Sequence, residues 1–380
     1  MALIAPDGTP TEITGIFQAL NGAILSVASA DKLLDEFIPG AIGSFLGVMN
    51  THLAANYALE GRLKKDVLKQ SPRKTKEMQL SFLADAGKLS NGRPGKEKTT
   101  VDEPYAVWFV PFGDFVHQAS QGDNPSYNNQ MVGALAAFDY SYSNFIFGGG
   151  LGYVYNFVEY GSGLGHGNVQ EEMAMIYGTY NEDRYWLNAA LWAGIFQLQN
   201  KRHPLLNVTS TGNTNGWIFS PHIEAGVPFS YKNEQKIILE PFFMFDFVNS
   251  WQAGFTEKGS SGLNLVIQSL YTSLLRSEVG TRFYETLDTK WGNIIFQEKF
   301  SYVNMTPFHF NPMAATFVGS AASFPIAIGS TQVQNLGSFE LNITYLPENS
   351  IYPYLSLAAE GEWGAYYQSY FIGLEIGKNF

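Results

Sequence analysis

The last segment of the chain, YFIGLEIGKNF, alternates apolar side chains with polar or small ones and stops at an aromatic residue. Successive side chains of an extended strand point to opposite sides, so a period of two indicates a strand with one apolar and one polar face. The apolar face here consists of Tyr370, Ile372, Leu374 and Ile376. The same alternation recurs in segment after segment from about residue 105 onward. This repetition predicts an all-β chain whose strands all carry an apolar surface.

Twelve segments with this period are predicted to be strands. They span 106–118, 129–141, 144–157, 168–180, 184–198, 216–230, 235–248, 271–286, 291–304, 334–347, 351–363 and 369–380. A single-chain outer-membrane barrel has an even number of antiparallel strands. Closure is required because an open sheet edge in hydrocarbon leaves backbone N–H and C=O groups without partners. The pattern therefore predicts a 12-stranded antiparallel transmembrane β-barrel over residues 105–380.

Composition supports a membrane barrel and argues against a membrane helix. Charged residues make up 15% of the chain, against about 25% in ordinary soluble domains. The sequence contains no uninterrupted apolar stretch of about 18 residues, which a transmembrane helix needs. There are no cysteines, so disulfides and thiolate metal sites are excluded. The formal net charge of -11 argues against nucleic acid as a partner.

Two features of the strands qualify this pattern. Aromatic residues gather at predicted strand ends, where a barrel forms interfacial girdles. These residues are Trp108, Tyr140, Tyr142, Tyr185, Trp217, Trp291 and Trp363. Glu298 is a misfit, because the alternation of Phe296, Phe300 and Tyr302 turns it outward. It is expected to lie near a rim or to break the register.

Residues 31–70 carry good helix formers with apolar residues at helical spacing, and they are predicted to form a helix with Pro39 near its start. From Pro39 through Lys69, roughly 31 residues, such a helix would be about 46 Å long at 1.5 Å per residue, enough to cross a bilayer. Several of its residues are too polar to face lipid, namely Asn50, His52, Asn56, Glu60 and Arg62. A helix of spanning length that avoids hydrocarbon is predicted to lie inside the pore of the barrel. An amphipathic helix packed on a soluble domain is the alternative.

The remaining N-terminal parts are predicted to be connecting segments. Residues 62–98 hold eleven basic and four acidic side chains, and residues 71–104 are interpreted as a basic linker. Residues 1–30 are interpreted as the remnant of a longer exported region or a linker.

Inward positions of the predicted strands collect ionisable side chains, which belong in an aqueous lumen because charges on the lipid face are costly. These residues are Glu224, Glu240, Asp246, Arg276, Glu278, Arg282, Glu340, Glu360 and Glu375. We expect this wall to contact the helix, chiefly through Arg62, Lys64 and Lys65. A generically polar lumen, with water between wall and helix, is the alternative.

The order of several segments adds a family resemblance. A Pro-led helix between ADKLLDEFIPGAIG and YALEGRL is followed by LEPFFMFDFVNSWQAGFTEKGSSGLNLVI, NIIFQEKFSYVNMTPFHF and ATFVGSAASFPIAIGS. Taken together, residues 30–380 resemble the β-domain of bacterial autotransporters, the type V self-secretion proteins. WGAYYQSY from Trp363 and NGAI at 21–24 resemble elements of the chlamydial polymorphic membrane proteins within that family.

The resemblance implies an outer-membrane translocator of a Gram-negative-type bacterium that exports an N-terminal passenger and then retains the helix in its pore. It implies contact with outer-membrane lipid, with periplasmic chaperones and with the barrel-assembly machinery. The assembly signal would comprise Tyr370, Ile372, Leu374, Ile376 and Phe380. The short region before the helix is expected to mean that the passenger is absent and that the chain is a truncated product or fragment.

No enzyme, cofactor or metal site is predicted. The histidines are scattered without HExxH spacing, and no GxSxG or phosphate-binding loop occurs. Two functional alternatives remain open: an outer-membrane porin or channel, and a soluble β-rich adhesion module.

Overall fold

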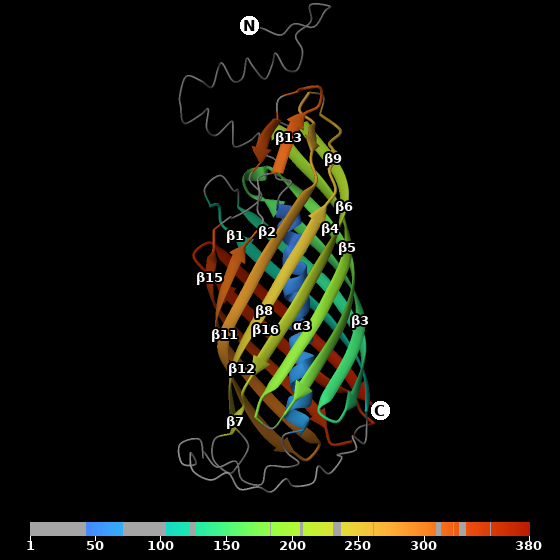
Figure 1. The fold of residues 1–380 in the computed structure, drawn as a ribbon, viewed down its shortest axis with the longest axis vertical. Coiled ribbons are helices and arrows are strands. Elements are labelled where there is room, and N and C mark those ends of the chain that lie inside the picture. The colour runs from blue at the N-terminus through green and yellow to red at the C-terminus, as the bar shows by residue number, and fades with distance from the viewer. Residues whose placement is uncertain are drawn as a thin grey trace, which may run out of the picture.

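The computed structural model shows a tall, closed β-barrel with one helix running through it (Figure 1). The structure describes residues 43–70, 104–121, 126–182, 184–205, 208–230, 237–260, 262–308, 313–321, 323–326, 332–349 and 351–380. The predicted segment 1–30, the part of the predicted helix before residue 43 and nearly all of the linker 71–104 lie outside these residues.

Twelve long antiparallel strands form the barrel wall. They are β1 (Tyr105–Gln118), β2 (Tyr127–Tyr142), β3 (Phe145–Tyr160), β4 (Gly165–Asn181), β5 (Trp186–Leu205), β6 (Val208–Gly226), β8 (Ile237–Gln252), β11 (Leu270–Thr289), β12 (Gly292–Pro307), β15 (Gln334–Pro347), β16 (Tyr354–Trp363) and β17 (Tyr367–Asn379). Each strand pairs with the next, and β17 pairs with β1, which closes the ring. Tyr105 and Phe380 exchange two backbone hydrogen bonds of 3.1 and 2.9 Å at this seam. The predicted fold class is confirmed.

The two ends of the barrel differ. The lower end carries Phe380 and the tight β2–β3 turn, whereas the upper end carries the β1–β2 connection and a small second sheet (Figure 1). That sheet contains β9 (Phe255–Thr256), β10 (Leu265–Ile267), β13 (Met313–Phe317) and β14 (Ser323–Ile326). A buried ion pair of 2.6 Å between Arg202 and Glu257 ties it to β5. At the lower end the short β7 (Phe229–Ser230) pairs with β8.

The β5–β6 hairpin is longer than predicted. Residues 199–205 and 208–215 continue both strands above the wall, where the outward side chains include Gln199, Lys201, Asn213 and Asn215. The apolar and polar alternation is lost there because both faces are polar. The small upper sheet also falls in segments that the sequence assigned to connections.

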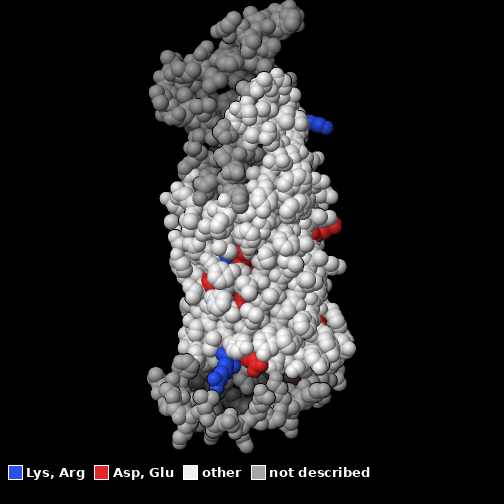
Figure 2. Space-filling model, in the orientation of Figure 1, with Lys and Arg blue, Asp and Glu red and all other residues white. Residues whose placement is uncertain are grey.

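Most outward positions of the wall are apolar, as expected for lipid contact. Exposed aliphatic and aromatic side chains dominate the middle of the barrel, and charged residues are sparse on the face in view (Figure 2). Six of the seven predicted girdle aromatics are exposed; the expectation for Trp108 is wrong. Trp108 is 1% exposed and points inward, where its indole donates to Asp139 at 3.2 Å. Val110 and Phe112 also point inward, so both faces of β1 are apolar and alternation could not orient it.

The expectation for Glu298 is also wrong. The side chain is exposed on the outer wall, yet the pairing of β12 with both neighbours is unbroken around it. Glu298 lies opposite Phe283 on one side and Leu341 on the other. It lies four residues below Tyr302 and four above Ile294, whose cross-strand partner is Tyr345. The acid therefore lies midway between the aromatic levels instead of near a rim.

Helix α3 (Gly43–Gln70) runs inside the barrel, with its first turn at the upper end and its last turn at the lower end (Figure 1). This helix lacks the long apolar stretch that a membrane-spanning helix needs. Described side chains of 47–60 are all buried. The backbone lies nearest to β2–β5, where glycines of β3 leave room for neighbouring wall side chains: a Cβ at Gly148 would collide with Tyr177. The opposite wall reaches the helix with long side chains.

Candidate functional site

The upper half of α3 is sealed into the barrel by apolar packing. Val48, Met49 and Leu53 are each at most 3% exposed and belong to one buried cluster with wall side chains. The wall members that contribute at this end include Val116, Tyr127, Val158, Leu198, Val248, Val303, Met305 and Leu336. They come from strands all around the ring, so they form a collar about the helix. We call this set, with the three helix residues, the apolar collar.

Two polar contacts accompany the collar. The Asn156 side chain on β3 donates to the hydroxyl of Thr51 at 2.6 Å and to the carbonyl of Gly47 at 3.5 Å. His52 Nε2 lies 2.6 Å from Glu171 Oε1 on β4, with both side chains fully buried. Buried polar groups need such partners because an unsatisfied donor or acceptor costs its full desolvation.

Midway along the helix the contacts become ionic. Asn56 donates to Asp246 at 2.7 Å, and the same carboxylate lies 2.6 Å from His222 Nδ1 and 3.4 Å from Arg276. The Tyr57 hydroxyl donates to Glu362 at 2.7 Å, and Arg276 also pairs with Glu362 at 2.8 Å. These contacts join α3 to β6, β8, β11 and β16.

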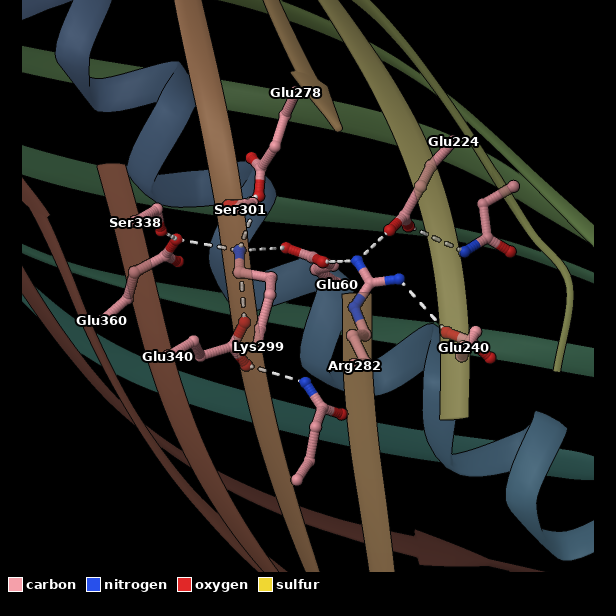
Figure 3. Close-up of polar contacts among 12 residues, drawn as sticks. Glu60, Glu224, Glu240, Glu278, Arg282, Lys299, Ser301, Ser338, Glu340 and Glu360 are labelled. Carbon is pink, nitrogen blue, oxygen red and sulfur yellow. Dashed lines mark hydrogen bonds and ion pairs between the residues drawn. The ribbon is translucent and has the colours of Figure 1, made fainter. Parts of the chain in front are cut away.

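Glu60 marks the centre of the lower half (Figure 3). It pairs with Arg282 through one carboxylate oxygen, and its other oxygen lies 3.7 Å from Lys299 Nζ. Arg282 and Lys299 are direct cross-strand partners on β11 and β12. Like charges directly opposite destabilise a sheet, so the helix supplies a carboxylate between two bases that would otherwise repel.

Wall carboxylates complete this arrangement. Arg282 also pairs with Glu224, and with Glu240 at 3.2 Å. Lys299 has three further acidic neighbours: Glu360 at 2.8 Å, Glu278 at 3.3 Å and Glu340 at 3.3 Å. We call Glu60, Arg282, Lys299 and these five wall acids the charged cage. Every cage side chain is nine-tenths or more buried.

The cage contributes more to positioning the helix than to net stability. Desolvating two charges offsets most of their Coulomb energy, so a buried pair adds little over an apolar pair. Removing one partner is costly, because the other remains buried without a counter-charge. His52, Asn56 and Glu60 are spaced four residues apart and share one helix face, and each meets its own wall carboxylate or base. The set therefore defines both the rotation and the height of α3 in the lumen. Among the described residues, no group of His, Asp and Glu side chains is arranged to hold a metal ion.

The structure brings together most of the residues singled out as lumen contacts. Glu224, Glu240, Glu278, Arg282, Glu340 and Glu360 lie in the cage, while Asp246 and Arg276 lie above it near Asn56. Glu375 is buried elsewhere on the wall and accepts a hydrogen bond from Tyr354 at 2.7 Å. The side chains of Arg62, Lys64 and Lys65 lie outside the described residues, so their contacts stay a prediction.

Several residues of the site were not among the sequence candidates. Lys299 is the main omission, although the outward alternation around Phe300 placed it inward by the same rule that selected Arg282. Glu60 and Asn56 were read only as polar helix residues. His222, Glu171 and Glu362 carry no motif, and only the register between helix and wall identifies them.

The proposed assembly signal lies on the lipid side of β17. Tyr370, Ile372, Leu374 and Ile376 are 40–51% exposed, and Phe380 is 54% exposed. Phe380 stacks on Tyr105 with ring centroids 6.1 Å apart, at the seam where the barrel closes.

Comparisons with known proteins agree with this geometry. The family model of the autotransporter β-domain matches residues 107–368. The translocator domain of the autotransporter NalP from Neisseria meningitidis has a similar structure, with TM-score 0.60, 13% identity, and coverage of 87% of this chain and 98% of that one. The β-domain of the Bordetella autotransporter BrkA gives TM-score 0.55 and 18% identity over 72% of this chain and 99% of that one. At these identities the likeness shows the fold. None of the curated proteins matches the chain in sequence.

Proposed function

The chain belongs to the autotransporter β-domain family, and from that premise we propose that the barrel passes an N-terminal passenger outward and then holds α3 as a plug. Its role as an integral outer-membrane translocator follows from the family and the barrel. The plugging role of α3, the contacts that hold it and the nature of the passenger are the proposed parts.

One observation carries the proposal: the N-terminal end of α3 and the C-terminus of the barrel lie at opposite ends of the lumen. Gly47, in the first turns of α3, lies against Val158 and Asn129 at the upper end, whereas Phe380 closes the wall at the lower end. Any chain attached ahead of α3 therefore leaves the lumen on the side opposite to the C-terminus. This is the topology of a passenger delivered to the cell surface by a barrel that enters from the periplasm.

The filled lumen favours a translocator over a diffusion channel. Val48, Thr51, His52 and Ala54 on the helix have no exposed surface. An open porin needs a continuous aqueous path, whereas the collar packs side chains against α3 around the ring.

The topology can be tested by placing one epitope tag in intact cells. In the first version the full chain, directed to the envelope by an export signal, carries the tag ahead of residue 1. In the matched version the tag lies between Ser143 and Asn144, in the lower β2–β3 turn. The proposal expects antibody and external protease to reach the first tag and not the second. A protected N-terminal tag with an accessible turn tag would contradict it.

Delivery of the barrel to the membrane is a further part of the proposal. The exposed apolar face of β17 and the terminal Phe380 support recognition by periplasmic chaperones and the barrel-assembly machinery. We also retain the narrower kinship with the chlamydial polymorphic membrane proteins as a proposal. No catalytic role is proposed for the barrel.

A further inference from the structure

A trough crosses the outer wall of the barrel from β3 to β6, and Asn249 on β8 and Tyr271 on β11 lie at its far end. Its volume is about 710 Å³, within the range of about 300–1,000 Å³ that ligand pockets span. Most of its lining consists of side chains that point away from the lumen. The trough therefore opens on the surface that faces lipid, on the other side of the wall from the apolar collar and the charged cage.

Two alanines form the floor of the trough. Ala174 on β4 and Ala193 on β5 are direct cross-strand partners, and both point outward. The larger outward side chains around them are Leu151, Ile176, Ile195, Trp217 and Phe219, each at least 40% exposed. A one-carbon side chain between longer ones leaves a hollow in the surface. Side chains that line a hollow lose dispersion contacts unless another molecule fills it.

The surroundings of the trough select an acyl chain as its occupant. Tyr153 and Trp217 are exposed aromatic side chains of the kind that mark a membrane interface, and the trough extends below them into the apolar wall. Water is a poor occupant, because a bound water needs about three polar partners. The amide oxygen of Asn249 already accepts hydrogen bonds from Tyr271 at 3.0 Å and from Ser273 at 2.9 Å. The trough thus continues the lipid-facing surface of the barrel and deepens it.

A carboxylate lies at the upper edge of the trough. Glu172 points outward on β4, where its cross-strand partners are Tyr153 on β3 and Ile195 on β5. Within the described part of the chain, no hydrogen bond or ion pair reaches this carboxylate. Interfacial aromatic residues lie at the level of the lipid headgroups, so Glu172 is placed to meet a headgroup. An ammonium group satisfies it best, because charge-assisted hydrogen bonds are roughly twice as strong as neutral ones.

We propose that the trough binds one membrane lipid, with an acyl chain over Ala174 and Ala193 and with the headgroup ammonium on Glu172. Charge complementarity favours an aminolipid over a lipid that is held by its phosphate. The outward pair next above Glu172 is Gln170 and Gln197, which carry no positive charge. Lipid on the flat parts of the wall exchanges freely, whereas this lipid is held by the sides of the trough and by the carboxylate.

Native mass spectrometry tests the proposal by counting the lipids that the protein retains. The full chain is reconstituted in vesicles of equal amounts of phosphatidylethanolamine and phosphatidylcholine, and is then transferred to detergent. The Ala193→Phe variant fills the trough with a ring. The matched control is Ala359→Phe, which adds the same ring at an exposed outward alanine of β16. Heat-modifiable gel mobility confirms that each variant is folded.

The proposal expects one retained phosphatidylethanolamine per chain in the unaltered protein and in Ala359→Phe, and none in Ala193→Phe. Equal retention by all three proteins would mean lipid that merely surrounds the barrel, and it would overturn the proposal. An unaltered chain that retains no lipid, or that carries a second copy of the chain instead, would overturn it as well.

The headgroup contact has its own variant and control. Glu172→Leu should lower the preference for phosphatidylethanolamine over phosphatidylcholine by about tenfold, the effect of losing a hydrogen bond to a charged group. Glu298→Leu removes another outward carboxylate, away from the trough, and should leave the preference unchanged. A preference that survives Glu172→Leu would overturn the assignment of the ammonium to this carboxylate. None of these outcomes depends on passenger export, so they are separate from the tests of the proposed function.

Discussion

The upper and lower halves of α3 contact the barrel wall through different kinds of interaction. Around Val48 and Leu53 the wall closes on the helix with apolar side chains from the whole ring. Around Glu60 it closes with Arg282 and Lys299, reaching across from the far wall. Hydrophobic burial excludes water and is non-directional, whereas a buried ion pair needs good geometry to offset its desolvation. From this comparison we propose that the collar forms the permeability seal and that the cage positions the helix.

Removing a base from the cage should have the largest effect. Lys299→Met leaves Glu278, Glu340 and Glu360 buried around an apolar side chain, and we expect a loss of about 3–5 kcal/mol in unfolding free energy. Denaturant titration followed by heat-modifiable gel mobility measures it. Lys258→Met on the exposed upper sheet is the matched control, with a change within about 0.5 kcal/mol. If both variants unfold alike, the cage has no structural role.

Truncating a collar side chain should have the second largest effect, which should appear as ion leakage through the barrel. Leu53→Ala opens a void where the helix meets the ring, at a cost of about 2–4 kcal/mol. In planar bilayers we expect more frequent channel openings than for the unaltered chain. Leu341→Ala, on the lipid face, is the control and should not change the current. If Leu53→Ala shows no increase in channel openings, the collar is not the permeability seal.

The neutral hydrogen bonds of Asn156 at the upper end should matter least. Asn156→Ala removes the donor to Thr51 and to the Gly47 carbonyl, and we expect a loss of about 1 kcal/mol in unfolding free energy. Asn213→Ala, exposed on the upper part of β6, should leave that value unchanged. An effect larger than that of Leu53→Ala would mean that polar contacts, and not apolar packing, hold the upper half of the helix.

The alternation of side chains was enough to predict the strands and the sidedness of the wall. It failed where the two faces of a strand are alike, as with Trp108 on the doubly apolar β1 and with residues 199–205 and 208–215 above the membrane. It could also indicate which residues face inward, including Arg282 and Glu240. Which of them meet was beyond it, because the Glu60 to Lys299 contact depends on the rotation and height of α3 against a wall far away in sequence.

Glu298 shows a different limit. The alternation turned Glu298 outward, and the expectation of a rim position came from the cost of charge in lipid. The register instead places it midway between the aromatic levels. The general cost of a charge on the lipid face therefore does not decide the height of a single residue, which the register of its strand fixes.

The most direct test of the account is a nitroxide scan along β17 in lipid vesicles, from residue 370 to residue 376, using single cysteines in this cysteine-free chain. A barrel wall that faces lipid predicts high oxygen collision rates at Tyr370, Ile372, Leu374 and Ile376 and low rates at Phe371, Gly373 and Glu375. Low oxygen accessibility at both sets would mean that the apolar faces pack on one another in a dry interior, which would contradict the barrel and the translocator together.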